Sequence, residues 1–337
     1  MRSTKTLVLT ALAFALVQIS GIARSDEPVK LRVSWTVVPF EVEPVLFMTK
    51  DVMTHLGKSY TIELPRFQAS SSMLTSLASG DLDIASLSAF TFNAAIRTAG
   101  MTDLRLIADE YEDGVDGYFT GTFRVLKDGP VHKIEDMKGK VFASFGLGSA
   151  SDMSARLMLR RHGLEDKRDY QVIEANGNNM PAMLYEHKVD LINTTGFTSR
   201  DPELIAKSDI LFTRREAFGG PSQETVWAAR SGFLAKNRAA VVDYLEDTLR
   251  ALNWCLDPKN HDAAVALVAA FAKAPAERFQ WMFTGGDEYR DPKGMPKVEN
   301  FQHAIDVEHD MGLIANPVDV KQYLDLSLVE EAAARLK

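Results

Sequence analysis

The chain has 337 residues, with 38 Lys and Arg against 46 Asp and Glu, and its formal net charge is −8 at pH 7. Proteins that bind nucleic acid present a basic face to phosphate, so this acidic balance argues against a nucleic-acid partner. It leaves open a small anionic ligand, which the ends of helices can hold locally. The single cysteine, Cys255, excludes an internal disulfide.

The first 25 residues have the three regions of a secretory signal peptide. Basic Arg2 and Lys5 come first, an apolar run covers residues 7–17, and small residues up to Ser25 precede Asp26. The apolar run is short for a membrane span, although a retained N-terminal anchor is the alternative. Removing residues 1–25 takes away three basic residues and no acids, so the net charge goes from −8 to −11. We expect export to the periplasm without a lipid anchor, because no cysteine lies near the cleavage site.

The first part of the mature chain alternates between expected strands and helices. Strands over 31–35, 61–64 and 84–87 are separated by helices over 43–56 and 70–80, a pattern typical of a mostly parallel sheet with right-handed crossovers. The serines at 70–72 should begin the second helix, and Gly80 should end it in a left-handed conformation. A helix over 90–99, a strand over 104–108, an acidic loop over 109–117 and a strand over 123–126 complete this part.

A second unit follows with the same alternation. Its expected elements are a strand from Lys140, a Gly-bearing loop before a helix that ends at His162, and strands and helices at 170–174, 180–186, 191–193 and 210–212. The stretch around Asp190 repeats the order found around Asp83: a charged turn, an Asp, a short apolar strand and small polar residues. This repetition predicts two similar lobes.

The chain then returns through a strand over 225–229 and is nearly all helical afterwards, with helices over 238–256, 263–271, 276–283, 298–311 and 318–336. A helical tail of this length cannot form a third sheet, so it should pack around the first lobe. We expect the first lobe to comprise residues 26–120 and 226–337, and the second lobe residues 121–225. About three hundred mature residues fit two medium domains.

Polar residues at strand ends and helix starts are the candidate ligand contacts. Ligands of open α/β sheets bind at the carboxyl ends of strands, and free amides at a helix start can hold an oxygen. Ser70, Ser71, Ser88 and Ser149 could each cap a helix, contact a ligand or do both. Thr194 and Thr195 follow the strand over 191–193. Trp35 could be core or a platform for a flat ligand, and Phe40 lies in the loop after it.

The sequence does not indicate catalysis, a metal or a cofactor. Asp81, Asp83 and Asp190 lie in turns and strand starts, where structural roles are expected rather than paired acid and base work. The seven histidines have no metal-ligand spacing, and no nucleophile has a partnered base. Cys255 lies on a helical pattern beside Trp254 and is expected to be buried packing.

In order and spacing, these motifs resemble the periplasmic substrate-binding proteins of ABC importers, in the nitrate/sulfonate/taurine-binding group with the NMT1/THI5-like domain. The matching stretches are the exported start, the serine run before Met73, residues 80–85, residues 136–141, the Gly148-Ser149 loop and residues 188–191. The resemblance implies the α/β, two-lobed type II periplasmic-binding-protein fold, with a mixed sheet flanked by helices in each lobe and extended hinge segments between them.

The resemblance also implies a site and partners. It places a small solute against Trp35, Ser70, Ser71 and Ser88 from the first lobe, and Ser149, Ala150, Thr194 and Thr195 from the second. The closed monomer would dock on an inner-membrane permease that an ATPase drives. Family ligands include alkanesulfonates, nitrate, pyrimidine precursors and aromatic carboxylates.

Two alternatives stay open beside transport: an enzyme on the same scaffold, and a periplasmic sensor partner. The related enzymes use cysteine- and histidine-rich motifs for pyrimidine synthesis, and this chain lacks them. No cluster of Arg or Lys falls on the predicted strand ends, which favours a monoanion or a polar aromatic over a doubly charged anion. We therefore expect a solute-binding component for a small organic anion of the sulfonate or aromatic carboxylate type.

Overall fold

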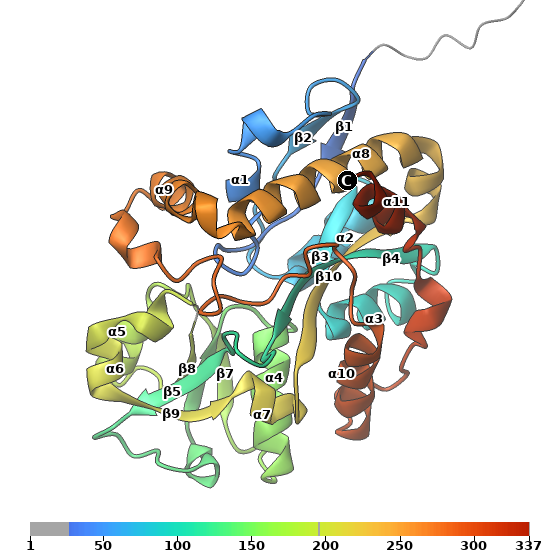
Figure 1. Ribbon diagram of the computed structural model, residues 1–337. Helices are drawn as coiled ribbons and strands as arrows, with labels where there is room; N and C mark the ends of the chain where they lie inside the picture. Colours follow the sequence, from blue (N-terminus) through green and yellow to red (C-terminus); the bar gives the residue numbers. More distant parts are fainter. Residues whose placement is uncertain (1–26, 195, 337) are drawn as a thin grey trace, which may run out of the picture.

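The computed structural model describes residues 27–194 and 196–336, and it contains two α/β lobes (Figure 1). The predicted signal peptide, residues 1–25, and the candidate ligand contact Thr195 lie outside the described residues. Both stay predictions.

The sheet of the first lobe is built around the returning strand. β10 (Ser222–Arg230) lies between β3 (Ile84–Leu87) and β4 (Leu104–Asp113) and runs antiparallel to both. β1 (Val29–Arg32) pairs in parallel with β2 (Tyr60–Glu63), and a bridge between Val33 and Ile84 joins this pair to β3. The first three strands are therefore parallel, as their sequence pattern predicts. β10 inserts antiparallel to β3 and β4, so the sheet as a whole is mixed, as the family resemblance implies.

The second lobe has one five-stranded sheet in the order β7-β6-β8-β5-β9. β6 is parallel to β7 and β8, whereas β5 is antiparallel to β8 and β9. The strands are β5 (Thr122–Leu126), β6 (Val141–Ser144), β7 (Gln171–Glu174), β8 (Leu191–Asn193) and β9 (Ser208–Thr213). The helices of this lobe are α4 (Ala150–Arg161), α5 (Met180–Tyr185), α6 (Pro202–Lys207) and α7 (Arg214–Phe218).

The sequence did not predict α6 and α7, although both have local start signals. The carboxylate of Asp201 accepts a hydrogen bond from the amide of Leu204, which caps α6. The hydroxyl of Thr213 and the side chain of Glu216 form a reciprocal capping box at the start of α7.

Two first-lobe elements follow the sequence closely. α2 (Ser70–Ser79) ends at Gly80, whose φ of 78° is left-handed, and β3 covers the predicted strand. α3 (Ala89–Arg97) then begins after Ser88. Every residue of β3 is buried, Ser86 included, which agrees with its mainly apolar sequence.

The predicted helix over 43–56 was wrong. Only α1 (Glu43–Leu46) and a 3-10 turn (Lys50–Val52) form there. The segment after this turn is held by Asp247, whose carboxylate accepts hydrogen bonds from the amides of Thr54, His55 and Leu56. These amides bind a side chain on a distant helix and are not available for a helix of their own.

The helical tail packs on the first lobe, as predicted. Its helices are α8 (Ser231–Leu256), α9 (His261–Ala272), α10 (Val298–Asp310) and α11 (Ser327–Arg335). α10 contacts β10 and α3, and α11 contacts α8 and β4. The helix expected over 276–283 is a short 3-10 turn (Ala276–Phe279), and the helix expected over 318–336 is divided into a 3-10 turn (Val320–Tyr323) and α11.

The chain crosses between the two sheets twice, through residues 114–121 and 214–221. These crossings lie close to the predicted lobe boundaries, although residues 222–225 belong to β10 in the first sheet. The division of the chain at 120 and 225 stays a prediction. Within 27–194 and 196–336, no helix combines the length and apolarity needed to cross a bilayer.

Candidate functional site

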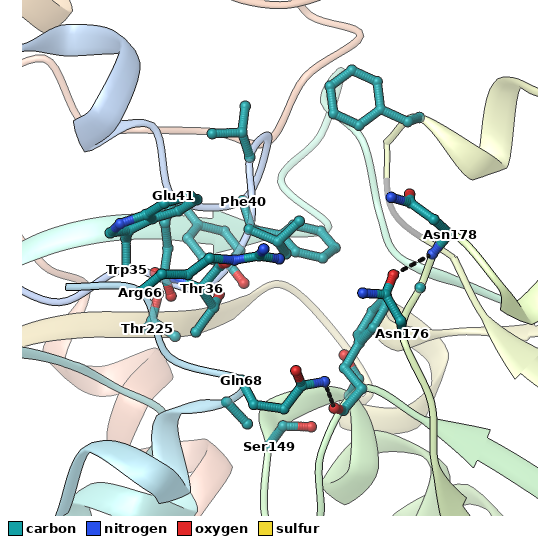
Figure 2. A pocket seen from close by; sticks show the side chains of 18 of the residues that line it. Trp35, Thr36, Phe40, Glu41, Arg66, Gln68, Ser149, Asn176, Asn178 and Thr225 are labelled. Atoms are coloured by element: carbon teal, nitrogen blue, oxygen red, sulfur yellow. Dashed lines mark hydrogen bonds between the residues drawn. The ribbon is translucent and has the colours of Figure 1, made fainter. Parts of the chain in front are cut away.

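A cavity of about 420 Å³ is lined by residues of both lobes and of the helical tail (Figure 2). The segments after β1, β6 and β7 reach it from the carboxyl ends of these strands, where ligands of open α/β sheets bind. Much of its wall is aromatic: the rings belong to Trp35, Phe40, Tyr111, Phe145, Phe197, Phe271 and Phe279.

Trp35 is held as a flat surface on one wall. Its indole Nε1 donates a hydrogen bond to the carbonyl of Leu64 at 2.9 Å, and its ring meets Phe271 edge to face at 5.7 Å between centroids. The guanidinium of Arg66 lies 5.4 Å from the Trp35 ring. A tryptophan fixed in this way keeps a face for a flat ligand at little entropic cost.

Phe40 forms part of the inner wall, between the two lobes. Its ring stacks on Tyr111 at 5.8 Å and meets Phe145 of the second lobe edge to face at 6.2 Å. The guanidinium of Arg214 lies 5.5 Å from the ring, and the carbonyl of Phe40 accepts a hydrogen bond from Arg290 Nη2 at 3.1 Å. These contacts fix the loop after β1 at the inner wall of the cavity.

Two helices begin at the cavity, one from each lobe. Ser70 is the first residue of α2, and Ser149 precedes Ala150 at the start of α4. The hydroxyl of Ser149 accepts a hydrogen bond from the amide of Asp152 at 3.2 Å. Helix starts carry free amides and partial positive charge, so an anionic group fits between them.

The structure separates the predicted contacts into two groups. Trp35, Phe40, Ser70, Ser149 and Ala150 line the cavity, whereas Ser71, Ser88 and Thr194 do not. The Ser71 hydroxyl donates to the carbonyl of Leu147 in the other lobe at 2.8 Å. Ser88 is buried and caps α3 by accepting from the amide of Thr91. Thr194 is fully buried, and its Oγ1 lies 2.6 Å from Oγ1 of Thr122.

Sequence reasoning missed several polar residues of the wall. Asn176 and Asn178 follow β7, and the amide of Asn178 donates to Oδ1 of Asn176 at 3.0 Å (Figure 2). Their place directly after a predicted strand is the signal that could have found them. Gln68 donates through Nε2 to the carbonyl of Phe145 at 2.9 Å and so joins the two lobes at the rim. Arg66 and Glu41 gave no comparable signal in the sequence.

Residues 25–269 match the model of the NMT1-like family. The chain belongs to this family. No curated protein sequence matches the chain.

Solved structures show the same fold. The alkanesulfonate-binding protein SsuA from Xanthomonas axonopodis pv. citri, bound to MOPS, has a TM-score of 0.68 at 16% identity over 89% of this chain and 99% of that one. The periplasmic nitrate-binding protein NrtA from Synechocystis PCC 6803 has a TM-score of 0.68 at 15% identity over 92% and 90%. The desulfurization enzyme DSZB has a TM-score of 0.63 at 13% identity over 92% and 100%. The predicted two-lobed periplasmic-binding-protein fold is confirmed.

The inner wall of this NMT1-like cavity carries buried carboxyl groups. Glu224 lies 2.8 Å from Nη1 of Arg214, yet burial raises its pKa to about 7 against the opposing effect of that charge. No basic side chain in the described part of the chain forms an ion pair with Glu41. Burial, together with the nearby charge of Glu43, raises the pKa of Glu41 to about 8.

These carboxyl groups should make the free energy of unfolding fall as the pH rises. Burial raises the pKa of Glu43 and of Asp109 to about 7 as well. In the unfolded chain, such groups lose their proton near a pKa of about 4. Between the unfolded and folded pKa values the folded state binds more protons, so stability is greatest below the unfolded pKa and is lost as the pH rises toward 8.

Each group that keeps an extra proton in the folded state lowers the free energy of unfolding by about 1.4 kcal/mol for each pH unit of increase. Urea denaturation at several pH values between about 5 and 8 measures this slope. The charged groups that face Glu41 are Glu43 and Glu110. Glu41→Gln should therefore flatten the dependence of the free energy of unfolding on pH, most of all at the alkaline end of the range. A stability that rises with pH across this window would contradict the assignment.

Proposed function

We propose that the chain is the solute-binding component of an ABC import system. It captures a small organic anion, of the sulfonate or aromatic carboxylate type, between its two lobes and delivers it to an inner-membrane permease that an ATPase drives. The observation that carries the proposal is the aromatic-lined cavity of about 420 Å³ between the lobes. This volume falls in the range of small-molecule sites.

The charge of the solute is inferred from the helix starts and from Arg66. α2 and α4 both begin at the cavity, and their first amides can hold the oxygens of one anionic group. Figure 2 shows the guanidinium end of Arg66 extended toward the wall that carries Asn176 and Asn178. Arg66 and Arg278 both line the cavity with exposed side chains, and together with the two helix starts they supply positive charge for an anionic group.

The aromatic rings would hold the body of the solute. Trp35 offers a fixed face on one side, and Phe40 with Phe145 closes the inner end. A flat ring gains contact area on such walls without ordering new side chains. Aromatic sulfonates and carboxylates therefore satisfy both the polar and the apolar parts of the cavity.

Contacts between the lobes support a clamp that closes on its solute. Gln68 and Ser71 from the start of α2 donate hydrogen bonds to the carbonyls of Phe145 and Leu147 in the other lobe. A solute that contacts both walls would favour this closed arrangement over an open one by its differential affinity. The closed form would be the one that the permease recognises.

The buried thiol supports binding over catalysis. Cys255 is 1% exposed, and burial raises its pKa to about 12. A thiol in this state is protonated near neutral pH and does not act as a nucleophile. A sensor partner would use the same cavity and the same closure, and it differs from a transport protein only in the membrane protein that it meets.

A thermal-shift screen of sulfonates, aromatic carboxylates, nitrate and pyrimidines tests the proposal. A ligand at about a hundred times its dissociation constant should add about 2.7 kcal/mol to the free energy of unfolding. A flat melting temperature across all four classes, together with turnover of any of them, would argue for an enzyme instead.

Trp35→Ala should weaken binding of the solute found in this screen by about ten- to a hundredfold, because one aromatic face is worth about 1–3 kcal/mol. Isothermal titration calorimetry measures the affinity. Ser88→Ala is the matched control: it should cost about 1 kcal/mol of stability through the lost helix cap and leave affinity unchanged. Equal effects of the two substitutions on affinity would contradict the placement of the site.

A further inference from the structure

The inner wall of the cavity contains a chain of two carboxyl groups and one hydroxyl. Oγ of Ser86 lies 2.9 Å from Oε1 of Glu41 and within hydrogen-bond distance of Oε2 of Glu110. Ser86 is fully buried, and the two glutamates are 3% and 5% exposed. Glu41 reaches the cavity surface, so this chain ends at the solute's side.

One hydroxyl proton cannot satisfy two carboxylates. Ser86 donates to one of them, so the other carboxyl group must carry a proton and donate back to the serine oxygen. The amide of Thr36 donates to the second oxygen of Glu41, and Oε1 of Glu110 has no hydrogen-bond partner. The wall therefore offers more acceptor oxygens than the protein supplies with donors.

No basic side chain pairs with either carboxyl group within residues 27–194 and 196–336. The buried Arg214 is ion-paired with Asp113 and Glu224, and the buried Arg290 with Asp287. Thr225, which also lines the cavity and is 5% exposed, lies beside Glu110, but among the described residues its Oγ1 makes no hydrogen bond of full length and angle. A buried polar group without a hydrogen bond destabilises the protein. A ligand that supplies the missing hydrogen bond removes this cost and gains binding free energy.

We propose that the inner end of the cavity binds a nitrogen-borne hydrogen-bond donor of the solute, an amino group that donates to Glu41 with Thr225 Oγ1 as its second acceptor. This inference rests on the proposed binding function and narrows the solute class. Glu41 and Ser149 lie on different sides of the cavity (Figure 2). The solute is then a flat aromatic compound with an anionic group at the helix starts and an amino group at the opposite end.

Two pairs of nearly equal-sized compounds test this assignment: 4-aminobenzoate against 4-methylbenzoate, and 4-aminobenzenesulfonate against 4-methylbenzenesulfonate. In each pair a methyl group replaces the amino group and cannot donate. The amino member should bind about tenfold or more tightly than its methyl partner in at least one pair, because the methyl group leaves the buried acceptors unpaired. Affinities are measured by isothermal titration calorimetry.

Glu41→Gln should reduce the preference for the amino member to less than about threefold, since an amide supplies one acceptor oxygen where the carboxyl group has two. Glu63→Gln, on the surface strand β2 and ion-paired with Lys30, is the control and should keep the full preference. If Glu41→Gln does not fold, the affinities of the native protein for the amino and methyl compounds still test the assignment.

Methyl compounds that bind as tightly as the amino compounds, or a preference that survives in Glu41→Gln, would overturn the amino-group assignment while the binding function stands. Failure of both amino compounds to bind at millimolar concentration would also overturn it. Failure of every class in the wider screen would count against the binding function itself.

Discussion

Replacing Arg214 with methionine should lower the free energy of unfolding by about 3–5 kcal/mol, because it leaves two buried carboxylates without their counter-charge. Nη1 of Arg214 lies 2.8 Å from Glu224 and 3.3 Å from Asp113, and Nη2 donates to the hydroxyl of Ser151 at 2.9 Å. The side chain is 1% exposed. It joins the start of α7 in the second lobe to the ends of β4 and β10 in the first.

Urea denaturation at about pH 7 measures the loss. Arg238→Met is the matched control, since Arg238 pairs with Glu331 at 2.9 Å on the surface, and exposed pairs contribute at most about 1 kcal/mol. The loss in Arg214→Met should shrink at lower pH, where Glu224, whose pKa burial raises to about 7, becomes neutral. A loss below about 1 kcal/mol at neutral pH would show that Arg214 does not neutralise these acids in the folded chain.

Asp247→Ala should cost about 3 kcal/mol or more, because several donors lose a charged acceptor at once. The Asp247 carboxylate is fully buried and accepts from the amides of Thr54 at 2.7 Å, His55 at 2.9 Å and Leu56 at 3.0 Å, and from the hydroxyl of Tyr60 at 3.0 Å. The substitution therefore releases the segment between α1 and β2 from α8.

Hydrogen exchange gives a local readout of the same change. The amides of residues 54–56 should lose protection in Asp247→Ala, whereas the core strand β10 should lose it only in step with global stability. Asp257→Ala is the control: Asp257 accepts from the amide of Lys259 at 3.0 Å at a helix start, and its loss should cost about 1 kcal/mol. Unchanged protection at 54–56 would refute the anchoring role of Asp247.

Elements that depend on neighbours in sequence could be predicted. α2 stops at Gly80 because its left-handed conformation suits glycine, and β3 follows as a continuous buried strand. The structural roles expected for the aspartates also fit: Asp83 accepts from Arg32, and Asp190 from the amide of Val141. The turn and strand-start context of these aspartates is local, although their partners lie 51 and 49 residues away in the sequence.

Elements that depend on distant partners could not be predicted. The segment after α1 leaves the helical path because of Asp247, which is 193 residues from Thr54. β4 continues through the acidic stretch expected to be a loop, since β10 pairs with it as far as Asp113. Arg214 then neutralises that residue. Propensity and pattern carry no information on such pairings.

The same division holds for the site. Most strands, the longer helices and the two-lobed organisation could be inferred from the sequence, because periodicity, capping and the repeated motif encode them locally, whereas the short helices α6 and α7 were missed. Which side chains face the cavity depends on tertiary packing. Ser88 and Thr194 lie at predicted strand ends but turn into the protein to bond Thr91 and Thr122. Glu41 lines the cavity because its loop is packed against buried neighbours from distant strands, and no local pattern encodes that direction.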